Sequence, residues 1–304
     1  MLPARLSHTP RMTISVGALA VATSSVFIDL SGTSPSTSTF YRCLLAVPLL
    51  AFPAWRERMS RRPLDRRGVA NALLAGGFFA GDALLWTAAI YELGAGLSTV
   101  VVNAQVLILP LLALILDREP IGRRYWLALA PMLIGIALTA GILGHGTTSS
   151  HPLLGTIHAV AAAFCYSGFL YLLRRGGTAG LVLQPYLCVV IAGGIVGLLV
   201  GVVWRGVDLT PGWAAFGWLV LTAVLGQSIG WFLVAVASPR LPSTVSAALL
   251  LLTPVGALLL SALATGERPS PSQIAGAGLV LAGAYVASTN KTLTDASKAA
   301  SRRR

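Results

Sequence analysis

The sequence predicts an all-α polytopic membrane protein, with ten transmembrane helices arranged as two inverted five-helix repeats. Three observations support this fold class. The chain is 55% hydrophobic and only 11% charged, with a mean hydropathy of +0.78, whereas a soluble domain carries about 25% charged residues. Apolar segments long enough to cross a bilayer follow one another with short connections. The second half of the chain also repeats the first.

The apolar segments predict ten membrane spans, because a membrane-crossing helix needs about 20 mainly apolar residues. The predicted spans are 12–30, 36–55, 69–90, 95–116, 123–144, 153–173, 181–204, 212–237, 241–264 and 271–289. The first span follows Arg5 and Arg11, as the apolar part of a signal peptide follows basic residues. Nine further spans behind it favour an uncleaved helix.

The two halves of the chain align with a constant shift. A shift of 145 positions sets Tyr41 and Cys43 on Tyr186 and Cys188, Gly81 and Asp82 on Gly226 and Gln227, Trp86 on Trp231, and Ser98, Thr99 and Val100 on Ser243, Thr244 and Val245. After three inserted residues, a shift of 148 sets Glu119 on Glu267 and Gly135 on Gly283. Repetition at half the length of an apolar chain is typical of transporters with two halves around a central path.

The repeat divides the chain into four parts. We expect a cytoplasmic N-terminal segment at 1–11, a first five-helix repeat at 12–144, a second at 153–289 and a basic cytoplasmic tail at 290–304.

The distribution of basic residues predicts the orientation in the membrane. If the N-terminus is cytoplasmic, the inside segments hold Arg5, Arg11, Arg56, Arg58, Arg61, Arg62, Arg66, Arg67, Arg118, Arg123, Arg124, Arg174, Arg175, Arg240, Lys291, Lys298, Arg302, Arg303 and Arg304. Only Arg205 and Arg268 face outside, and Arg42 lies within a span. Because cytoplasmic loops are rich in Lys and Arg, both termini are expected in the cytoplasm. Each repeat has five spans, an odd number, so the second enters the membrane from the opposite side.

The chain resembles the drug/metabolite transporter superfamily, and in particular its EamA-type ten-helix members. The residues that carry the resemblance are Phe40, Tyr41 and Arg42 in the second span, Pro110 with Arg118, Glu119 and Pro120 after the fourth, Thr253 and Pro254, Gly266, Glu267 and Arg268, and Gly276, Leu281, Ala282 and Gly283. The resemblance covers about residues 12–289. It implies the ten-helix fold and the export of an amino acid or related metabolite.

Two matched pairs of polar and aromatic residues are candidates for a central site. Asp82 lies in the middle of the third span and Trp86 follows at i+4, on the same helix face. Gln227 and Trp231 have the same spacing in the eighth span. An ionisable side chain inside a membrane is costly and needs a reason. The inverted repeat predicts that the two pairs meet near the midplane and line one cavity, and the alternative is that Asp82 pairs with Arg42 and only locks helices together.

Four further residues are weaker candidates for substrate binding or coupling. Arg42 either contacts a substrate carboxylate, pairs with Asp82 or extends to the outer headgroups. His158 and Tyr166 recur on one face of the sixth span. His158 either lines the outer mouth of the path, where a histidine can titrate near neutral pH, or is a hydrogen-bonded histidine at the membrane interface. Asn103 faces the cavity or bonds between helices.

Glycines and two glutamates have structural interpretations. Gly193, Gly197 and Gly201 form a stripe that permits close helix packing in the seventh span, and the small residues of the tenth span form a packing face within the monomer or a dimer face. Glu119 and Glu267, beside basic residues at corresponding helix ends, are interpreted as loop anchors.

The sequence predicts a secondary transporter, not an enzyme, that moves a small metabolite by alternating access around a site formed by spans 1, 3, 4, 6, 8 and 9. No Walker A sequence is present, and the scattered cysteines and histidines favour neither a metal site nor another cofactor. Although the net charge is +12, the basic residues lie in short loops and the C-terminal tail, which argues against nucleic acid as a partner.

A proton is the candidate coupling ion, and the chain is expected in the plasma membrane as a monomer or a homodimer. The alternatives are an integral-membrane lipid-processing enzyme and a channel or lipid flippase.

Overall fold

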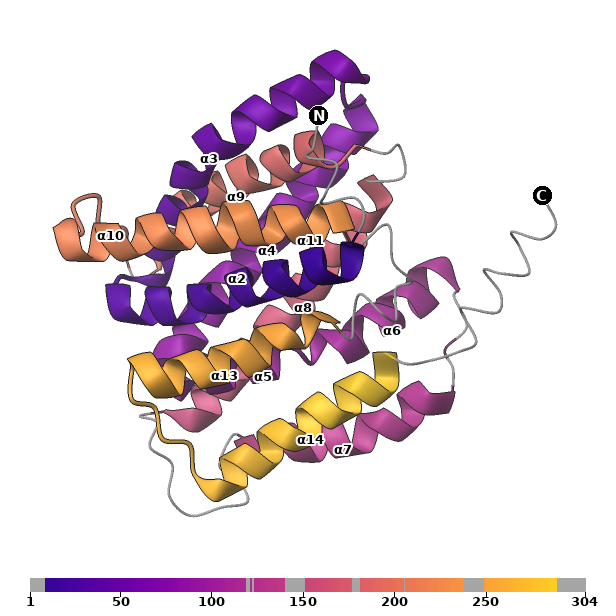
Figure 1. Cartoon of the computed structure of the whole chain (residues 1–304), viewed down its shortest axis with the longest axis vertical. Helices are drawn as coiled ribbons and strands as arrows, with labels where there is room; N and C mark the ends of the chain where they lie inside the picture. Colours follow the sequence, from indigo (N-terminus) through magenta and orange to yellow (C-terminus); the bar gives the residue numbers. More distant parts are fainter. Residues whose placement is uncertain are drawn as a thin grey trace.

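The computed structural model describes residues 9–118, 121, 123–139, 151–176, 181–204, 206–237 and 249–288, and these residues form helices joined by short connections. The helices are α2 (Pro10–Ser31), α3 (Pro35–Ser60), α4 (Arg66–Leu93), α5 (Ala95–Val102), α6 (Gln105–Asp117), α7 (Arg123–Thr139), α8 (Pro152–Gly176), α9 (Leu183–Val203), α10 (Trp213–Leu221), the π-helix η2 (Thr222–Gly230), α11 (Trp231–Ala237), α13 (Leu252–Ala264) and α14 (Pro271–Ser288). They run side by side across the molecule (Figure 1).

The all-helical membrane fold predicted from the sequence is confirmed. Seven of the described helical segments are long and apolar enough to cross a membrane, and α13 and α14 are shorter apolar helices. Many large apolar side chains lie on the outside of the bundle, including Leu199, Val203 and Leu263. Such a surface suits lipid rather than water.

Local sequence explains where the helices begin and end. Proline is the first residue of α2 and of α3, where its missing N–H has no helical partner to lose. The Asp65 side chain accepts a hydrogen bond of 2.9 Å from the Gly68 N–H and caps α4. Gly32 ends α2 in the left-handed conformation, with φ of 59°. A tight turn to α3 follows.

The fourth predicted span is not one helix but two, since α5 ends at Val102 and α6 starts at Gln105. At the break, the N–H groups of Asn103 and Ala104 bond to carbonyls three residues back. The Asn103 amide donates to the Thr99 carbonyl at 2.8 Å, the carbonyl that would accept from the Asn103 N–H in a regular helix. The predicted span at 95–116 is therefore confirmed as the apolar segment Ala95–Asp117, with a break in the helix at Asn103 that was not predicted.

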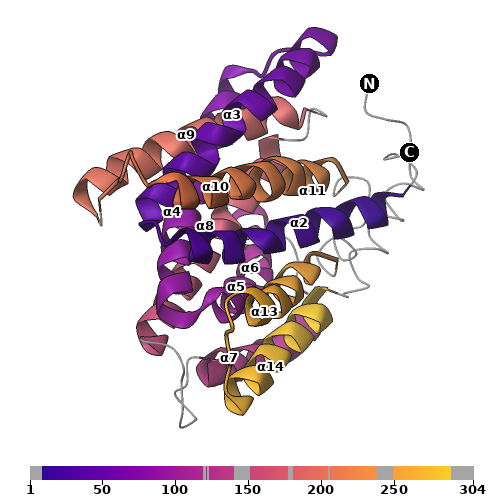
Figure 2. The same ribbon diagram turned by 60° about the vertical axis from the view of Figure 1, so that its left-hand side comes forward.

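The glycine stripes pack helices inside the monomer. A side chain at Gly197 would meet Thr39, and one at Gly193 would meet Phe79 and Cys43, so α9 lies close against α3 and α4. On α14, Gly283 lies directly against Met132 of α7. The α3–α9 and α7–α14 pairs lie at opposite ends of the bundle in both views (Figures 1 and 2).

The remaining helices form two groups between these pairs. In the first group, α8 packs against α4, α5 and α6. In the second group, α2 packs against α10, η2, α11 and α13. The two groups meet where α2 contacts α4 and α5, and where α5 contacts α13. We call them the α8 group and the α2 group.

Candidate functional site

Arg42 of α3 lies at the centre of a polar and aromatic cluster between the two helix groups. It is 4% exposed. Its Nε donates a hydrogen bond of 3.0 Å to Oε1 of Gln227, on η2 in the α2 group. Its guanidinium carbon lies 5.6 Å from the ring centre of Phe79 and 5.8 Å from that of Trp86, both on α4 in the α8 group. Arg42 thus contacts both groups, and the two aromatic faces stabilise its charge.

Gln227 is fully buried and bonded at both ends of its amide. Its Nε2 donates to the Tyr186 hydroxyl at 2.7 Å, and that hydroxyl donates to the backbone carbonyl of Gln227 at 2.8 Å. Tyr186 was not among the predicted site residues. The available signal was the repeat, which sets Tyr186 of α9 on Tyr41, next to Arg42. A π-helix also surrounds Gln227, and such segments are frequent at functional sites.

Asp82 of α4 is the acidic residue of the cluster around Arg42. Its Oδ1 is buried and has no hydrogen-bond partner. It interacts electrostatically with Arg42, and also with Cys165 and Tyr166 of α8, but within the described residues it forms no direct salt bridge with Arg42. The carboxylate and the guanidinium therefore interact electrostatically but are not directly paired.

Aromatic side chains from both groups surround the charged residues. Tyr166 lies 5.8 Å from Trp231 of α11, and Phe169 lies 5.7 Å from the same indole, each with an edge-on ring. Phe79 packs edge-on against Phe169 at 5.5 Å. Edge-to-face packing is the favoured geometry for aromatic pairs. These rings form an apolar contact across the boundary between the α8 group and the α2 group.

Trp86 and Asn103 both bond to Thr99, next to the break between α5 and α6. The Trp86 Nε1 donates to the Thr99 hydroxyl at 3.3 Å, and the Asn103 amide donates to its carbonyl. The Asn103 side chain thus bonds to the backbone of its own span.

His158 lies apart from the central cluster. Its Nδ1 is 2.5 Å from Oε2 of Glu92, near the end of α4. Glu92 lies ten residues beyond Asp82 on the same helix, about 15 Å along its axis. The sequence analysis did not identify Glu92, because a carboxylate near a helix end is usually exposed. His158 and Tyr166 share a helix but have different surroundings.

Glu267 acts as a loop anchor, as predicted. Its carboxylate accepts hydrogen bonds from the Ala95 and Gly96 N–H groups and caps α5. Glu119 lies outside the described residues. Within the described residues, no group of three or more His, Cys, Asp and Glu side chains could hold a metal ion.

Comparison with known proteins agrees with this architecture. The model of the EamA-like transporter family matches residues 11–141 and 153–289. The chain belongs to this family. Among curated proteins, it is 25% identical over 269 residues to inner membrane protein YtfF of Escherichia coli (strain K12), covering 80% of this chain and 83% of the relative. One crystal structure aligns with a TM-score of 0.60 at 18% identity over 92% of this chain and 96% of its own, which shows a common fold. The resemblance inferred from the sequence is confirmed, and so is the assignment to membrane transport.

Proposed function

We propose that this chain is a secondary transporter that moves a small metabolite, such as an amino acid or related compound, out of the cell by alternating access. The observation that carries the proposal is the position of Asp82 and Arg42 between two helix groups of a membrane protein of the EamA-like family. Both termini lie in the cytoplasm and the chain resides in the plasma membrane, in accord with the basic residues at one set of helix ends.

The pattern of helix contacts supports an inverted repeat. A shift of five spans maps the contact of α4 with α8 onto that of α10, η2 and α11 with α2. The same shift maps the contact of α6 with α8 onto that of α13 with α2, and each of the pairs α3–α9 and α7–α14 onto itself. The α8 group and the α2 group then correspond to one another. The family model also matches the chain as two segments.

The chemistry of the cluster favours a substrate with both charges and an apolar body. The buried Oδ1 of Asp82 has no partner, and leaving a buried charge without a partner costs about 3–5 kcal/mol. An ammonium group or a proton would remove this cost. Within the described residues Arg42 bonds through Nε, which leaves its terminal N–H groups to donate hydrogen bonds to an anionic group of the substrate. The indoles of Trp86 and Trp231 would flank the apolar part.

Substrate binding requires the two groups to separate. Gln227 and Trp231 are buried, so in this conformation the cluster is closed. The Tyr166–Trp231 contact joins α8 to α11, and separation of these helices would open a path between the groups. The break at Asn103 and the π-helix η2 lie beside the cluster, where a local change of helix geometry costs least.

Transport by the purified protein tests the proposal. The full chain in liposomes, loaded with a metabolite extract, should release a small set of compounds with saturable kinetics and should show counterflow. Asp82→Asn keeps the shape and removes the charge. It should fold normally and lower the rate about tenfold to hundredfold, because a hydrogen bond to a charged group contributes about 1.5–3 kcal/mol.

The matched control is Asp208→Asn, in an exposed loop where the carboxylate bonds only to Thr210 within the described residues. This variant should transport as the unmodified chain does. If proton coupling is the role of Asp82, Asp82→Asn should retain exchange and lose uphill transport. Normal stability with normal transport in Asp82→Asn would remove Asp82 from the site. Non-saturable flux would point to a channel.

A further inference from the structure

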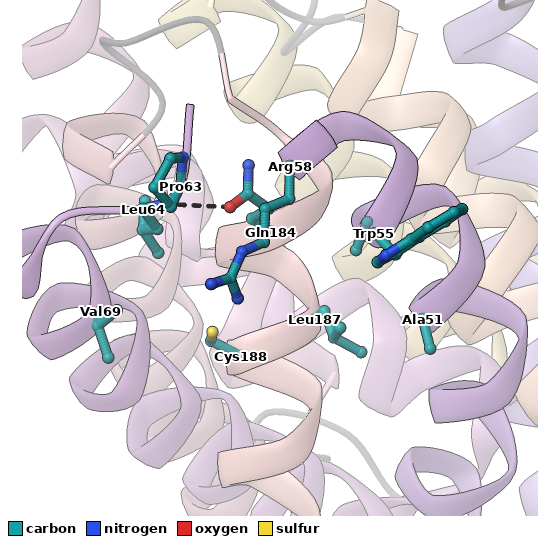
Figure 3. A pocket seen from close by; sticks show the side chains of 10 residues that line it. Ala51, Trp55, Arg58, Pro63, Leu64, Val69, Gln184, Leu187 and Cys188 are labelled. Carbon is teal, nitrogen blue, oxygen red and sulfur yellow. Dashed lines mark hydrogen bonds between the residues drawn. The ribbon is translucent and has the colours of Figure 1, made fainter. Parts of the chain in front are cut away.

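A cavity separate from the Asp82 cluster lies at the inner ends of α3 and α9. It has a volume of about 300 Å³, and Figure 3 shows it between the last turns of α3, the connection to α4 and the first turns of α9. Its walls include Ala51, Trp55 and Arg58 of α3 and Gln184, Leu187 and Cys188 of α9. These residues play no part in the proposed transport site.

At the polar end of this cavity, hydrogen bonds join the end of α3 and the connection to α4 to the start of α9. The Glu57 carboxylate accepts from the N–H groups of Val182, Leu183 and Gln184 and caps α9. The Gln184 side chain accepts from the Leu64 N–H at 3.1 Å and donates to the Arg62 carbonyl at 3.0 Å. The connection after α3 is thereby fixed across the start of α9. Side chains that bond in this way are not available to a ligand.

Arg58 is available to a ligand. Its side chain reaches over the cavity toward Cys188 (Figure 3), and within the described part of the chain it has no hydrogen bond or ion pair with another residue. Five other arginines lie within the same short stretch of sequence: Arg56, Arg61, Arg62, Arg66 and Arg67. The positive charge around the cavity favours an anionic ligand. A phosphate is suitable because a guanidinium binds it through paired hydrogen bonds.

The cavity changes from polar to apolar along α3. Arg58 and Gln184 lie at the inner ends of their helices, whereas Ala51 and Leu187 lie deeper in the bundle, with Ala51 about 10 Å from Arg58 along the helix axis. On the open flank, the Trp55 indole is 57% exposed and stacks on exposed Phe52 at 6.1 Å. Exposed aromatic rings beside basic residues are typical of the membrane interface.

We infer that this cavity binds one anionic glycerophospholipid of the inner leaflet, with the phosphate at Arg58 and the first part of an acyl chain along Trp55, Ala51 and Leu187. A free phosphate would use the polar end alone and would leave the apolar end empty. The lipid would connect α3 to α9, the pair that packs through the glycines of α9.

Native mass spectrometry of the full chain in detergent tests this inference. With equal amounts of phosphatidylglycerol and phosphatidylcholine, the protein should retain one phosphatidylglycerol with a preference of about fivefold, the effect that one basic residue near a membrane surface typically contributes. Arg58→Gln should abolish the preference. Arg67→Gln, at an exposed position outside the cavity, should keep it.

Two further arms separate the possible ligands. Ala51→Phe fills the apolar end without changing the charge, and it should lower the binding of both lipids; this arm holds even if Arg58→Gln fails to fold. Glycerol 3-phosphate at millimolar concentration should not displace the lipid. Equal retention of the two lipids, an unchanged preference in folded Arg58→Gln, or full displacement by glycerol 3-phosphate would overturn the inference, and the last would indicate a soluble-anion site.

Discussion

Arg42 has contacts that no other side chain of the cluster combines. It bonds to Gln227 of the α2 group and stacks on two rings of the α8 group. A buried guanidinium is stable only when its donors and its charge are compensated. Part of that compensation depends on Tyr186, which holds the Gln227 amide in the orientation that presents Oε1 to Arg42. The stability of the cluster therefore depends on Tyr186, although Tyr186 forms no salt bridge with Arg42 or Asp82.

Tyr186→Phe tests this dependence. The substitution removes one hydroxyl and leaves the Gln227 Nε2 and carbonyl without their partner, so it should destabilise the protein by about 1–3 kcal/mol. The matched control is Tyr41→Phe, which removes a hydroxyl that donates to the Leu209 carbonyl at an exposed site. A thermal melt in detergent should show a clear decrease for Tyr186→Phe and little change for Tyr41→Phe. Equal melting temperatures would contradict the role given to Tyr186.

The sequence indicated which polar residues lie inside the membrane but not which bonds they form. Asp82, Trp86 and Gln227 were selected from their position in spans and from the repeat, and all three lie around Arg42. The direct Asp82–Arg42 pair, one of the alternatives, does not form in the described structure. Tyr186 and Glu92 were missed because the composition of a span does not show which neighbouring helix a hydroxyl or carboxylate faces.

At the scale of the helix, small residues decide which surfaces come together. Gly76 of α4 lies against Ala192 and the Val189 carbonyl of α9, whereas Gly77, one position later, faces open space. Two neighbouring glycines of one helix thus have opposite environments. Close approach of helix backbones through small residues is a main source of packing energy in membranes.

Gly76→Ala and Gly77→Ala form a matched pair that tests this packing. The same methyl group is added at both positions, so the difference in helix propensity cancels. Gly76→Ala should destabilise the protein by about 1–3 kcal/mol through overpacking, and Gly77→Ala should leave the melting temperature unchanged or raise it slightly. Equal effects of the two substitutions would show that α4 and α9 do not pack through Gly76.

Helix ends were predicted to within a few residues for most spans, because apolar length and capping residues are local properties. The span predicted at 95–116 corresponds to Ala95–Asp117, but its helix is broken at Asn103, which was not predicted. Its hydropathy stays high through the break, so composition carries no signal of it. Only the tendency of Asn to bond to nearby backbone groups could have suggested the break.

For the whole molecule, the charge pattern predicts the orientation in the membrane. Tags at residues 63 and 178 and at the C-terminus should be cytoplasmic, and tags at 148 and 208 should be outside, because cytoplasmic loops carry the excess of Lys and Arg. Accessibility of the tags to a membrane-impermeant reagent in intact cells and in lysed cells measures this. A cytoplasmic tag at 148 would contradict the ten-span inverted repeat.

We expect the α8 group and the α2 group to separate and rejoin during transport. Glu267, just beyond α13, bonds to the start of α5 and joins the two groups. If the two groups separate, this contact must open in every cycle. Locking it should stop transport without changing the fold.

The direct measurement uses cysteines at Ala95 and Glu267, in a chain from which Cys43, Cys165 and Cys188 have been removed. A short reducible crosslinker between them should abolish transport in liposomes, and reduction should restore it. The control pair, at Met132 and Gly283, joins α7 to α14 outside both groups, and its crosslinking should leave transport intact. Undiminished transport by protein that is fully crosslinked between positions 95 and 267 would contradict alternating access by these two groups.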